Sequence, residues 1–151
     1  MVIHPQSIVH SMVEFEDGAV KAQLGSADMR IPISYALMFP HRAAIKSEPF
    51  DFVKHSPLTF SEVDHAKYPA LGIAYECLRR GGNASCVMNG ANEVAVAAFL
   101  AGECRLTDIP LAIEYALQRA HFVEHPTLEQ YDASDAEARA LAKEYMENVK
   151  R

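Results

Sequence analysis

The chain has 151 residues, of which half are hydrophobic and 23% are charged, a composition typical of a globular protein with its own core. Its formal net charge of −6 and its lack of a Lys- and Arg-rich block argue against a nucleic-acid partner. No apolar run is long enough to span a bilayer, and the first residues lack the pattern of a secretory signal peptide. The three cysteines are too few and too widely spaced for a disulfide framework, so we expect reduced thiols and a cytoplasmic location without a membrane partner.

The first predicted elements form a β-hairpin. Residues Ile8 to Phe15 and Ala19 to Leu24 alternate between apolar and polar side chains, as half-buried strands do. Asp17 and Gly18 join them, and this dipeptide favours a tight primed turn with positive φ. Because a hairpin alone is marginally stable in water, we expect the two strands to need further partners.

A short helix and a long surface connection are expected next. Pro32 is suited to opening a helix over Ile33 to Phe39, and Pro40 ends it. Residues 41–57 show no clear period and read as a surface connection. We interpret Leu58-Thr59-Phe60 as a short strand or a simple anchor.

Four helical patterns follow, and their predicted bounds are Pro69 to Arg80, Asn89 to Ala101, Thr107 to Ala120 and Ser134 to Val149. Apolar residues recur at helical spacing in the second and third patterns, at Val94, Ala97, Ala98 and Ala101 and at Ile109, Ala112, Ile113, Ala116 and Leu117. The sequence therefore predicts an α+β fold, in which a small, mainly antiparallel sheet with a short helix precedes a C-terminal four-helix bundle. We place the boundary between residues 1–64 and 65–151.

Polar residues at the predicted helix starts are interpreted as caps. Thr107 is a plausible N-cap, and Ser134 with Glu137 fits a capping box. Asp135 and Glu137 could instead bind a divalent cation, but the helix dipole favours acids at a helix start. The polar stretch from Asn89 to Glu93 is likewise interpreted as a cap with an acidic first turn.

Two segments could line a ligand site. Residues His4 to Ser11 bring two histidines and two serines into the first strand, where an imidazole could carry protons near neutral pH. The alternative is that these are structural histidines on a half-buried strand. In the loop from Gly25 to Arg30, Met29 could lie against a planar ring, or it could fill a packing gap.

Several of these segments, in the same order and spacing, resemble the 1-deoxy-D-xylulose 5-phosphate reductoisomerase family. His4 to Val13 is similar to the family's H-P-Q-S-x-x-H-S-M-V stretch, and Asn89 to Leu100 is similar to its N-A-A-N-E helix. The segments from Ala22 to Ile33 and from Leu58 to Phe60 match its A-Q-L-G-x-x-D-M-R-x-P-I and L-T-F blocks. Gly90 stands where the family usually has Ala, a change expected to cost little near a helix start.

The resemblance implies an NADPH-dependent enzyme of the non-mevalonate isoprenoid pathway, which uses Mg²⁺ or Mn²⁺ and acts as a homodimer. Such an enzyme isomerises 1-deoxy-D-xylulose 5-phosphate and reduces the product to 2-C-methyl-D-erythritol 4-phosphate. By position, the resemblance implies that Ser7 contacts the sugar phosphate, that His10 lies in the active-site shell as a catalytic residue, and that Met29 packs beside the nicotinamide ring. It implies no metal ligand in this chain.

The family's metal-binding acids and its cofactor domain lie upstream of the matched region. Residues 1–64 would then be the end of the catalytic and dimerisation domain, and residues 65–151 would be the helical domain. We expect the chain alone to bind neither NADPH nor a metal tightly and to be inactive. Two other functions stay open, a non-catalytic dimerisation or binding module that uses the exposed hairpin edge, and a helical domain that binds a small ligand.

Overall fold

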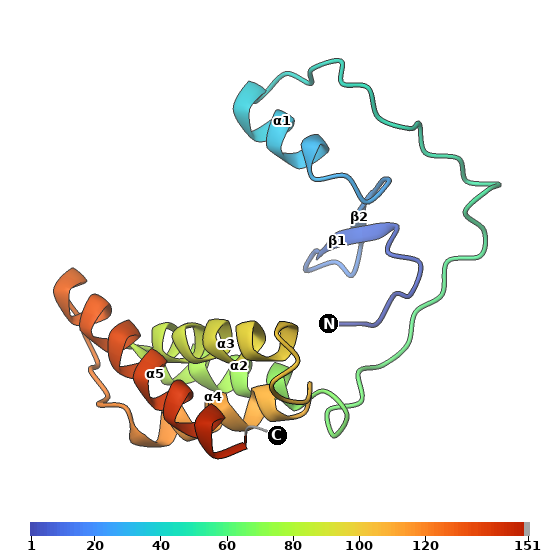
Figure 1. Ribbon diagram of the computed structural model, residues 1–151. Coiled ribbons are helices and arrows are strands. Elements are labelled where there is room, and N and C mark those ends of the chain that lie inside the picture. The colour runs from blue at the N-terminus through green and yellow to red at the C-terminus, as the bar shows by residue number, and fades with distance from the viewer. Residues whose placement is uncertain (150–151) are drawn as a thin grey trace. The chain divides into compact units, whose positions relative to one another are not determined.

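The predicted strands and helices fall into two units of the structure, a computed structural model that describes residues 1–149. The first unit, Met1–Val63, contains two strands and one helix, and the second begins at Asp64 and contains four helices (Figure 1). The predicted α+β class with a small antiparallel sheet is therefore confirmed. No helix within residues 1–149 combines the length and the apolar character needed to cross a membrane.

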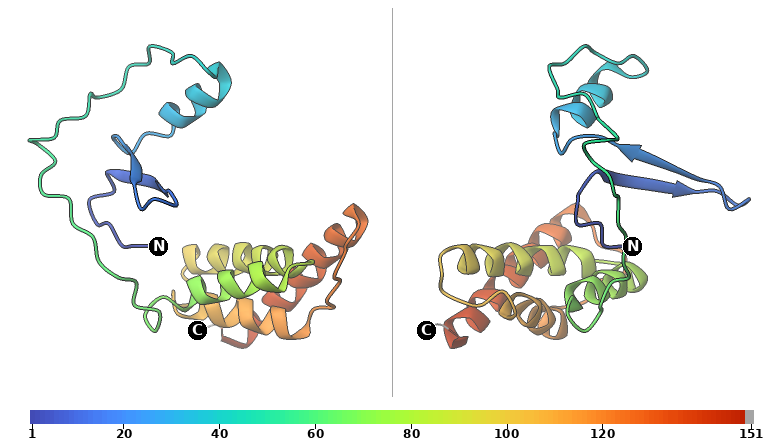
Figure 2. Two further views of the ribbon diagram at one scale, coloured as in Figure 1. Left: turned by 180° about the vertical axis from the view of Figure 1, so that it is seen from behind. Right: turned by 90° about the vertical axis from the view of Figure 1, so that its right-hand side faces the viewer.

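The hairpin consists of β1 (Val9–Glu14) and β2 (Val20–Leu24), which pair antiparallel and lie side by side in Figure 2. The turn differs from the predicted two-residue type, because the backbone N–H of Phe15 donates to the carbonyl oxygen of Ala19 at 2.9 Å. Three residues therefore form the loop, and its last residue, Gly18, has a φ of 82°. A three-residue hairpin loop needs positive φ at this last position, which glycine adopts without a steric penalty.

Helix α1 (Arg30–Met38) begins three residues earlier than the sequence indicated and ends one residue earlier. The carboxylate of Asp28 accepts a hydrogen bond from the backbone N–H of Arg30 at 3.0 Å, so an acidic side chain holds the first turn. Pro32 lies inside that turn instead of opening it, and this is tolerated because the first N–H groups of a helix have no intrahelical partner. None of residues 30–38 is buried.

The segment from Leu58 to Phe60 forms no strand, which favours its interpretation as an anchor. The next residue, Ser61, forms an isolated bridge with Ile3, and the two exchange backbone hydrogen bonds of 2.9 and 3.0 Å. The end of the first unit is thereby tied to its beginning.

The second unit contains α2 (Pro69–Arg80), α3 (Ala84–Leu100), α4 (Asp108–Arg119) and α5 (Leu128–Val149). Helix α3 packs against each of the other three, and α4 also packs against α2 and α5 (Figures 1 and 2). The bounds of α2 were predicted correctly, and α4 differs by one residue at each end. By contrast, α3 and α5 begin well before the predicted starts at Asn89 and Ser134.

Small residues dominate the core of the helical unit. Alanines spaced four residues apart, which lie on one helix face, are fully buried on α3, α4 and α5, at Ala91 and Ala95, Ala112 and Ala116, and Ala138 and Ala142. Such short side chains let helix axes approach closely. The predicted face of α4 is confirmed, with Leu117 half-buried. The face predicted for the second pattern is confirmed in part, since Val94 and Ala98 pack half-buried against the core while Ala97 and Ala101 are exposed. The fully buried positions of this helix include Val87, Ala91 and Ala95 instead.

The capping box predicted at Ser134 is wrong, because Ser134 lies inside α5 and is buried. The box is formed earlier, by Thr127 and Gln130. The Thr127 hydroxyl accepts from the Gln130 backbone N–H at 3.3 Å, and the Gln130 amide oxygen accepts from the Thr127 N–H at 2.8 Å. These two reciprocal bonds are what a capping box requires, so the helix starts at Leu128.

The predicted cap at Asn89 is also wrong, because this residue lies within α3 and donates to the Glu93 carboxylate at 3.1 Å. Across the interface, Arg139 of α5 bridges Glu93 and Asp135 with nitrogen–oxygen distances of 2.6 Å each. Asp135 therefore pairs with an arginine rather than capping a helix. Gly90 lies at this contact, where an added Cβ would be 2.8 Å from an Asp135 carboxylate oxygen, so its small size matters here and not at a helix start.

Candidate functional site

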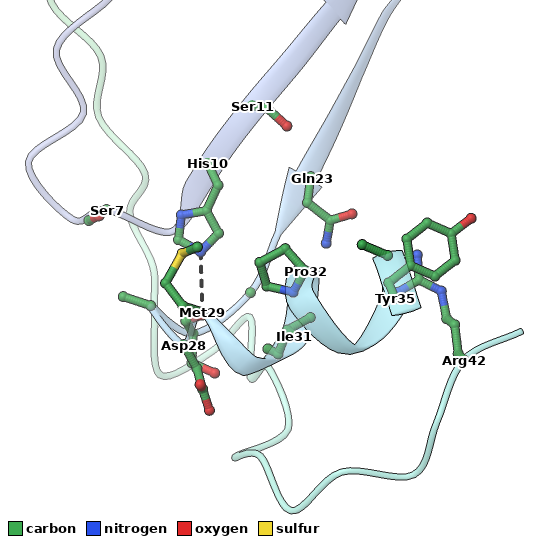
Figure 3. A pocket seen from close by; sticks show the side chains of 14 residues that line it. Ser7, His10, Ser11, Gln23, Asp28, Met29, Ile31, Pro32, Tyr35 and Arg42 are labelled. Atoms are coloured by element: carbon green, nitrogen blue, oxygen red, sulfur yellow. Dashed lines mark hydrogen bonds between the residues drawn. The ribbon is translucent and has the colours of Figure 1, made fainter. Parts of the chain in front are cut away.

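A pocket of about 470 Å³ opens in the first unit, where the end of the hairpin meets the start of α1. The three residues singled out from the sequence, Ser7, His10 and Met29, all line it (Figure 3). They come from three different segments, which are the loop before β1, the strand itself and the loop before α1. Figure 3 shows these three gathered at one end of the pocket, with Tyr35 and Arg42 at the other.

A β-bulge places His10 at the pocket. Along β1, Val9 pairs with Leu24 and Ser11 pairs with Gln23, so the register shifts between Val9 and Ser11 and His10 is the extra residue. In a regular strand, neighbouring side chains point to opposite faces. A bulge breaks this alternation and redirects a side chain, and here both His10 and Ser11 line the pocket.

The His10 ring is held by the loop that follows β2. Its Nε2 lies 3.3 Å from the carbonyl oxygen of Ser26. Because a carbonyl oxygen can only accept, Nε2 donates in this contact, and in the uncharged tautomer with this bond Nδ1 is an acceptor. The imidazole can thus receive a hydrogen bond from a ligand, while the Ser26 contact sets its orientation.

An ion pair at the start of α1 fixes the loop that carries Met29. Arg30 donates from Nε and Nη2 to the Asp28 carboxylate at distances between 2.7 and 3.0 Å. These hydrogen bonds from Arg30, first of all those of its side chain, lower the pKa of Asp28, so the carboxyl group stays ionised. Met29 lies between the two paired residues with 70% of its surface exposed, which leaves its thioether free to contact a ligand.

The far wall of the pocket was not anticipated from the sequence. Pro32, Tyr35 and Ala36 line it from one face of α1, where spacing of three and four residues brings side chains together. The Arg42 guanidinium lies 4.4 Å from the centre of the Tyr35 ring. The helical spacing of the first three could have indicated this wall, but nothing local indicated the position of Arg42.

The donor set suits an organic ligand better than a metal ion. Within residues 1–149, no three His, Cys, Asp or Glu side chains are grouped so that they could hold a metal. The carboxylate at the pocket, Asp28, already accepts from Arg30. In contrast, the thioether of Met29 beside Pro32 and Ile31 offers an apolar wall that suits one face of a planar ring.

Comparison with known proteins identifies relatives for nearly the whole chain. The family profile "DXP reductoisomerase C-terminal domain" matches residues 24–141. The chain is 49% identical over 144 residues to 1-deoxy-D-xylulose 5-phosphate reductoisomerase of Bacteroides fragilis, covering 95% of this chain and 37% of the relative. It is 46% identical over 146 residues to the Nitrosomonas europaea enzyme of the same name, covering 97% of this chain and 35% of the relative. The chain thus spans little more than a third of these relatives' length.

Solved structures show the same similarity. The reductoisomerase of Zymomonas mobilis in complex with NADPH superposes with a TM-score of 0.87 at 43% identity, covering 97% of this chain and 39% of its own. A DOX-P reductoisomerase in complex with NADPH, fosmidomycin and magnesium superposes with a TM-score of 0.88 at 37% identity, covering 97% of this chain and 38% of its own.

Proposed function

Because the chain belongs to the 1-deoxy-D-xylulose 5-phosphate reductoisomerase family, we propose that it supplies the C-terminal part of an enzyme dependent on NADPH and a divalent metal. This enzyme would convert 1-deoxy-D-xylulose 5-phosphate into 2-C-methyl-D-erythritol 4-phosphate in isoprenoid biosynthesis. The observation that carries the proposal is the meeting of Ser7, His10 and Met29 around one open pocket.

Each of the three residues has a role that fits its geometry. The Ser7 hydroxyl would exchange a hydrogen bond with a substrate oxygen, since a hydroxyl can both donate and accept. His10, oriented by the Ser26 carbonyl, would accept a hydrogen bond at Nδ1 from a substrate hydroxyl and hold it in the reacting position. Met29 would cover one face of the nicotinamide ring and exclude water from it.

This chain would contact NADPH but would not supply ligands to the metal ion. NADPH supplies the hydride when it is bound, and the wall formed by Met29, Ile31 and Pro32 fits the side of its ring. The magnesium or manganese ion would take its ligands from the part of the relatives that this chain does not cover. Residues 1–149 offer no group of acids for such an ion.

The two units would have separate tasks. We assign residues 1–64 to the end of the catalytic and dimerisation domain and residues 65–151 to a helical-bundle domain that acts as a scaffold. The tight alanine packing of α3, α4 and α5 supports a scaffold rather than a ligand-binding bundle. The free thiols of Cys77, Cys86 and Cys104 are compatible with a cytoplasmic location, which is part of the proposal.

The proposal is tested with a fusion protein, the chimaera. In it, the part of the Bacteroides fragilis relative that precedes the matched region is joined to this chain. Oxidation of NADPH with 1-deoxy-D-xylulose 5-phosphate is expected from the chimaera and not from the 151-residue chain. Replacing His10 with Gln in the chimaera is expected to lower kcat by about 10²-fold or more. Ser7→Ala is expected to raise the KM of the sugar phosphate, because it removes a substrate hydrogen bond.

The matched control is His125→Gln, since this exposed histidine belongs to the helical unit and does not line the pocket. It is expected to leave both kinetic constants unchanged. NADPH oxidation by the purified chain alone would refute its proposed inactivity, and an active chimaera indifferent to Ser7→Ala and His10→Gln would refute the assigned site.

The hairpin favours a second role, as a dimerisation edge. Most of both strands is exposed, including Val13 at 58% and Val20 at 56%, and the described sheet contains these two strands alone. Unpaired strand edges with apolar side chains favour pairing with another chain. We therefore propose that the enzyme is a homodimer in which this edge takes part. Light scattering should give a dimer mass for the chimaera, and Val13→Lys should shift it toward the monomer.

A further inference from the structure

Thr59 is held at all three of its polar atoms by the segment that leads to Ser7. Gln6 donates from Nε2 to the Thr59 hydroxyl at 2.7 Å, and its Oε1 accepts from the Thr59 backbone N–H at 3.3 Å. His4 donates from Nδ1 to the Thr59 carbonyl oxygen at 2.8 Å. The His4 ring also stacks on Phe60 with 4.6 Å between ring centres. Because neither segment belongs to a helix or strand, these bonds are specific side-chain contacts rather than parts of a ladder.

Ser7 has an unusual backbone conformation. Its φ is 51°, and within residues 1–149 it is the one non-glycine residue with positive φ. A side chain other than glycine rarely adopts this left-handed region and stays there when the surrounding structure holds it.

Both neighbours of Ser7 are anchored. On one side Gln6 is bound to Thr59, and the Ser7 N–H closes a turn onto the His4 carbonyl oxygen at 3.1 Å. On the other side Ile8 is 6% exposed, and its carbonyl oxygen accepts from the Gly25 N–H at 3.1 Å. The contact between Ile8 and Gly25 comes from the hairpin, so Thr59 is the partner that the fold adds from a distant segment.

We propose that Thr59 is a positioning residue for Ser7, which acts by binding Gln6 and His4 so that the Ser7 hydroxyl is presented to the pocket. Without these bonds, the His4–Ser7 turn keeps its own backbone hydrogen bond and the neighbouring Ile3–Ser61 bridge, but neither holds Gln6. Ser7 can then relax toward negative φ, and its hydroxyl loses its place at the pocket. The inference rests on the function proposed for Ser7 as a substrate contact. It adds that the segment at 58–60 serves the site from outside the pocket.

The first test examines the 151-residue chain by NMR, without substrate. Thr59→Val keeps the β-branched shape and removes the hydroxyl, and Gln6→Leu removes the bond to that hydroxyl together with the bond from the Thr59 backbone N–H. Both should shift the Ser7 amide resonance and change its coupling between the amide and α protons, while the amide of Tyr35 across the pocket stays unchanged. Thr59→Ser, which keeps a hydroxyl, should restore the native signals.

Thr107→Val is the matched control, because the side chain of this exposed threonine makes no capping bond and lies in the helical unit. It should leave the Ser7 signals unchanged. If the Ser7 resonance stays in place in both Thr59→Val and Gln6→Leu, the positioning role is overturned.

The second test uses kinetics of the chimaera to distinguish positioning from general stability. Thr59→Val should raise the KM of the sugar phosphate about three- to tenfold, as the loss of one hydrogen bond does, and should leave the KM of NADPH unchanged. In a Ser7→Ala background it should have no further effect, because the residue through which it acts is gone. An additive effect would overturn the proposal. If Ser7→Ala alone changes nothing, the function proposed for Ser7 fails, and the NMR result still decides whether Thr59 positions it.

Discussion

The side-chain nitrogen of Asn83 lies 2.9 Å from the Ser134 hydroxyl oxygen, although 51 positions separate the two residues in the chain. Asn83 also donates to the His121 carbonyl oxygen at 2.8 Å, and its Oδ1 accepts from the Val123 N–H at 3.0 Å. The Ser134 hydroxyl in turn donates to the Gln130 carbonyl oxygen at 2.7 Å. A single buried amide, 1% exposed, thus joins the start of α3, the α4–α5 connection and the interior of α5.

Asn83→Ala should strongly destabilise the helical unit, because the buried Ser134 hydroxyl, the half-buried Val123 N–H and the His121 carbonyl oxygen would all lose their bonds to this amide. We expect the free energy of unfolding to fall by about 2–3 kcal/mol, the cost of leaving buried polar groups unsatisfied. Urea unfolding followed by circular dichroism measures this change. Asn148→Ala is the control, since this exposed side chain donates to the Glu144 carbonyl oxygen on the surface of α5, and it should cost less than 0.5 kcal/mol. Equal effects would show that the Asn83 contacts contribute little.

Gly82→Ala should destabilise the chain by about 3 kcal/mol. The φ of Gly82 is 55°, and an added Cβ would overlap the Val123 carbonyl oxygen and lie 2.9 Å from a ring carbon of Phe122. The left-handed backbone and the steric overlap both contribute. Gly102→Ala separates them, because Gly102 has a φ of 76° and open space at its Cβ position. It should cost about 1 kcal/mol, from the backbone alone. Thermal unfolding of both variants provides the comparison.

Thr127→Ala should destabilise α5 by about 1 kcal/mol, the usual cost of losing an N-cap side chain. The reason is the reciprocal pair of hydrogen bonds between Thr127 and Gln130. Thr107→Ala is the matched control, since Thr107 precedes α4 without a capping bond from its side chain. Denaturant midpoints of the two variants would agree if the capping box contributed nothing.

The stabilisation from Arg139 should depend on pH. Its hydrogen bond to Glu93 lowers the pKa of that carboxyl group below the ordinary 4.5. Because this pKa is lower in the folded chain than in the unfolded chain, the stabilisation is fully present above about pH 5 and is lost as the pH falls through the folded-state value. The difference in urea midpoint between the original chain and Arg139→Met should therefore shrink from pH 7 to pH 3.

Arg79→Met is the control for this experiment. Arg79 pairs with Glu76 on the surface of α2, where both side chains are more than 60% exposed. Such a pair contributes little, so the midpoint should change little at either pH. A difference for Arg139→Met that is as large at pH 3 as at pH 7 would contradict the ion-pair explanation.

Local patterns predicted the elements better than their ends. The hairpin and the four helices α2 to α5 were predicted because alternation and helical spacing are properties of neighbouring residues. The starts of α3 and α5 were wrong because Asn89 and Ser134 are residue types that often cap helices. In the structure they lie inside helices, where Ser134 bonds to Asn83 and Asn89 bonds to Glu93. The sequence alone does not distinguish a polar residue within a helix interface from an N-cap, because the two differ in the hydrogen-bond partner of the side chain.

The pocket, too, was predicted only in part from the sequence. Ser7, His10 and Met29 could be singled out from the sequence, but their roles remain predictions, and strict alternation along β1 would have placed His10 and Ser11 on opposite faces. The bulge that brings both to the pocket depends on how β1 pairs with β2, which no pattern within one strand records. Tyr35 and Arg42 complete the pocket in a way that only the folded chain could show.

The sequence by itself determined the family, the α+β class and the approximate position of every helix and strand, because these depend on residue types and their local spacing. Only the tertiary structure decided which atoms meet: Thr59 with Gln6, Asn83 with Ser134, and Arg139 with Glu93. Each of these contacts joins residues more than forty positions apart. Hydrogen bonds and ion pairs act over a few ångströms, so their partners are set by the packing of whole units.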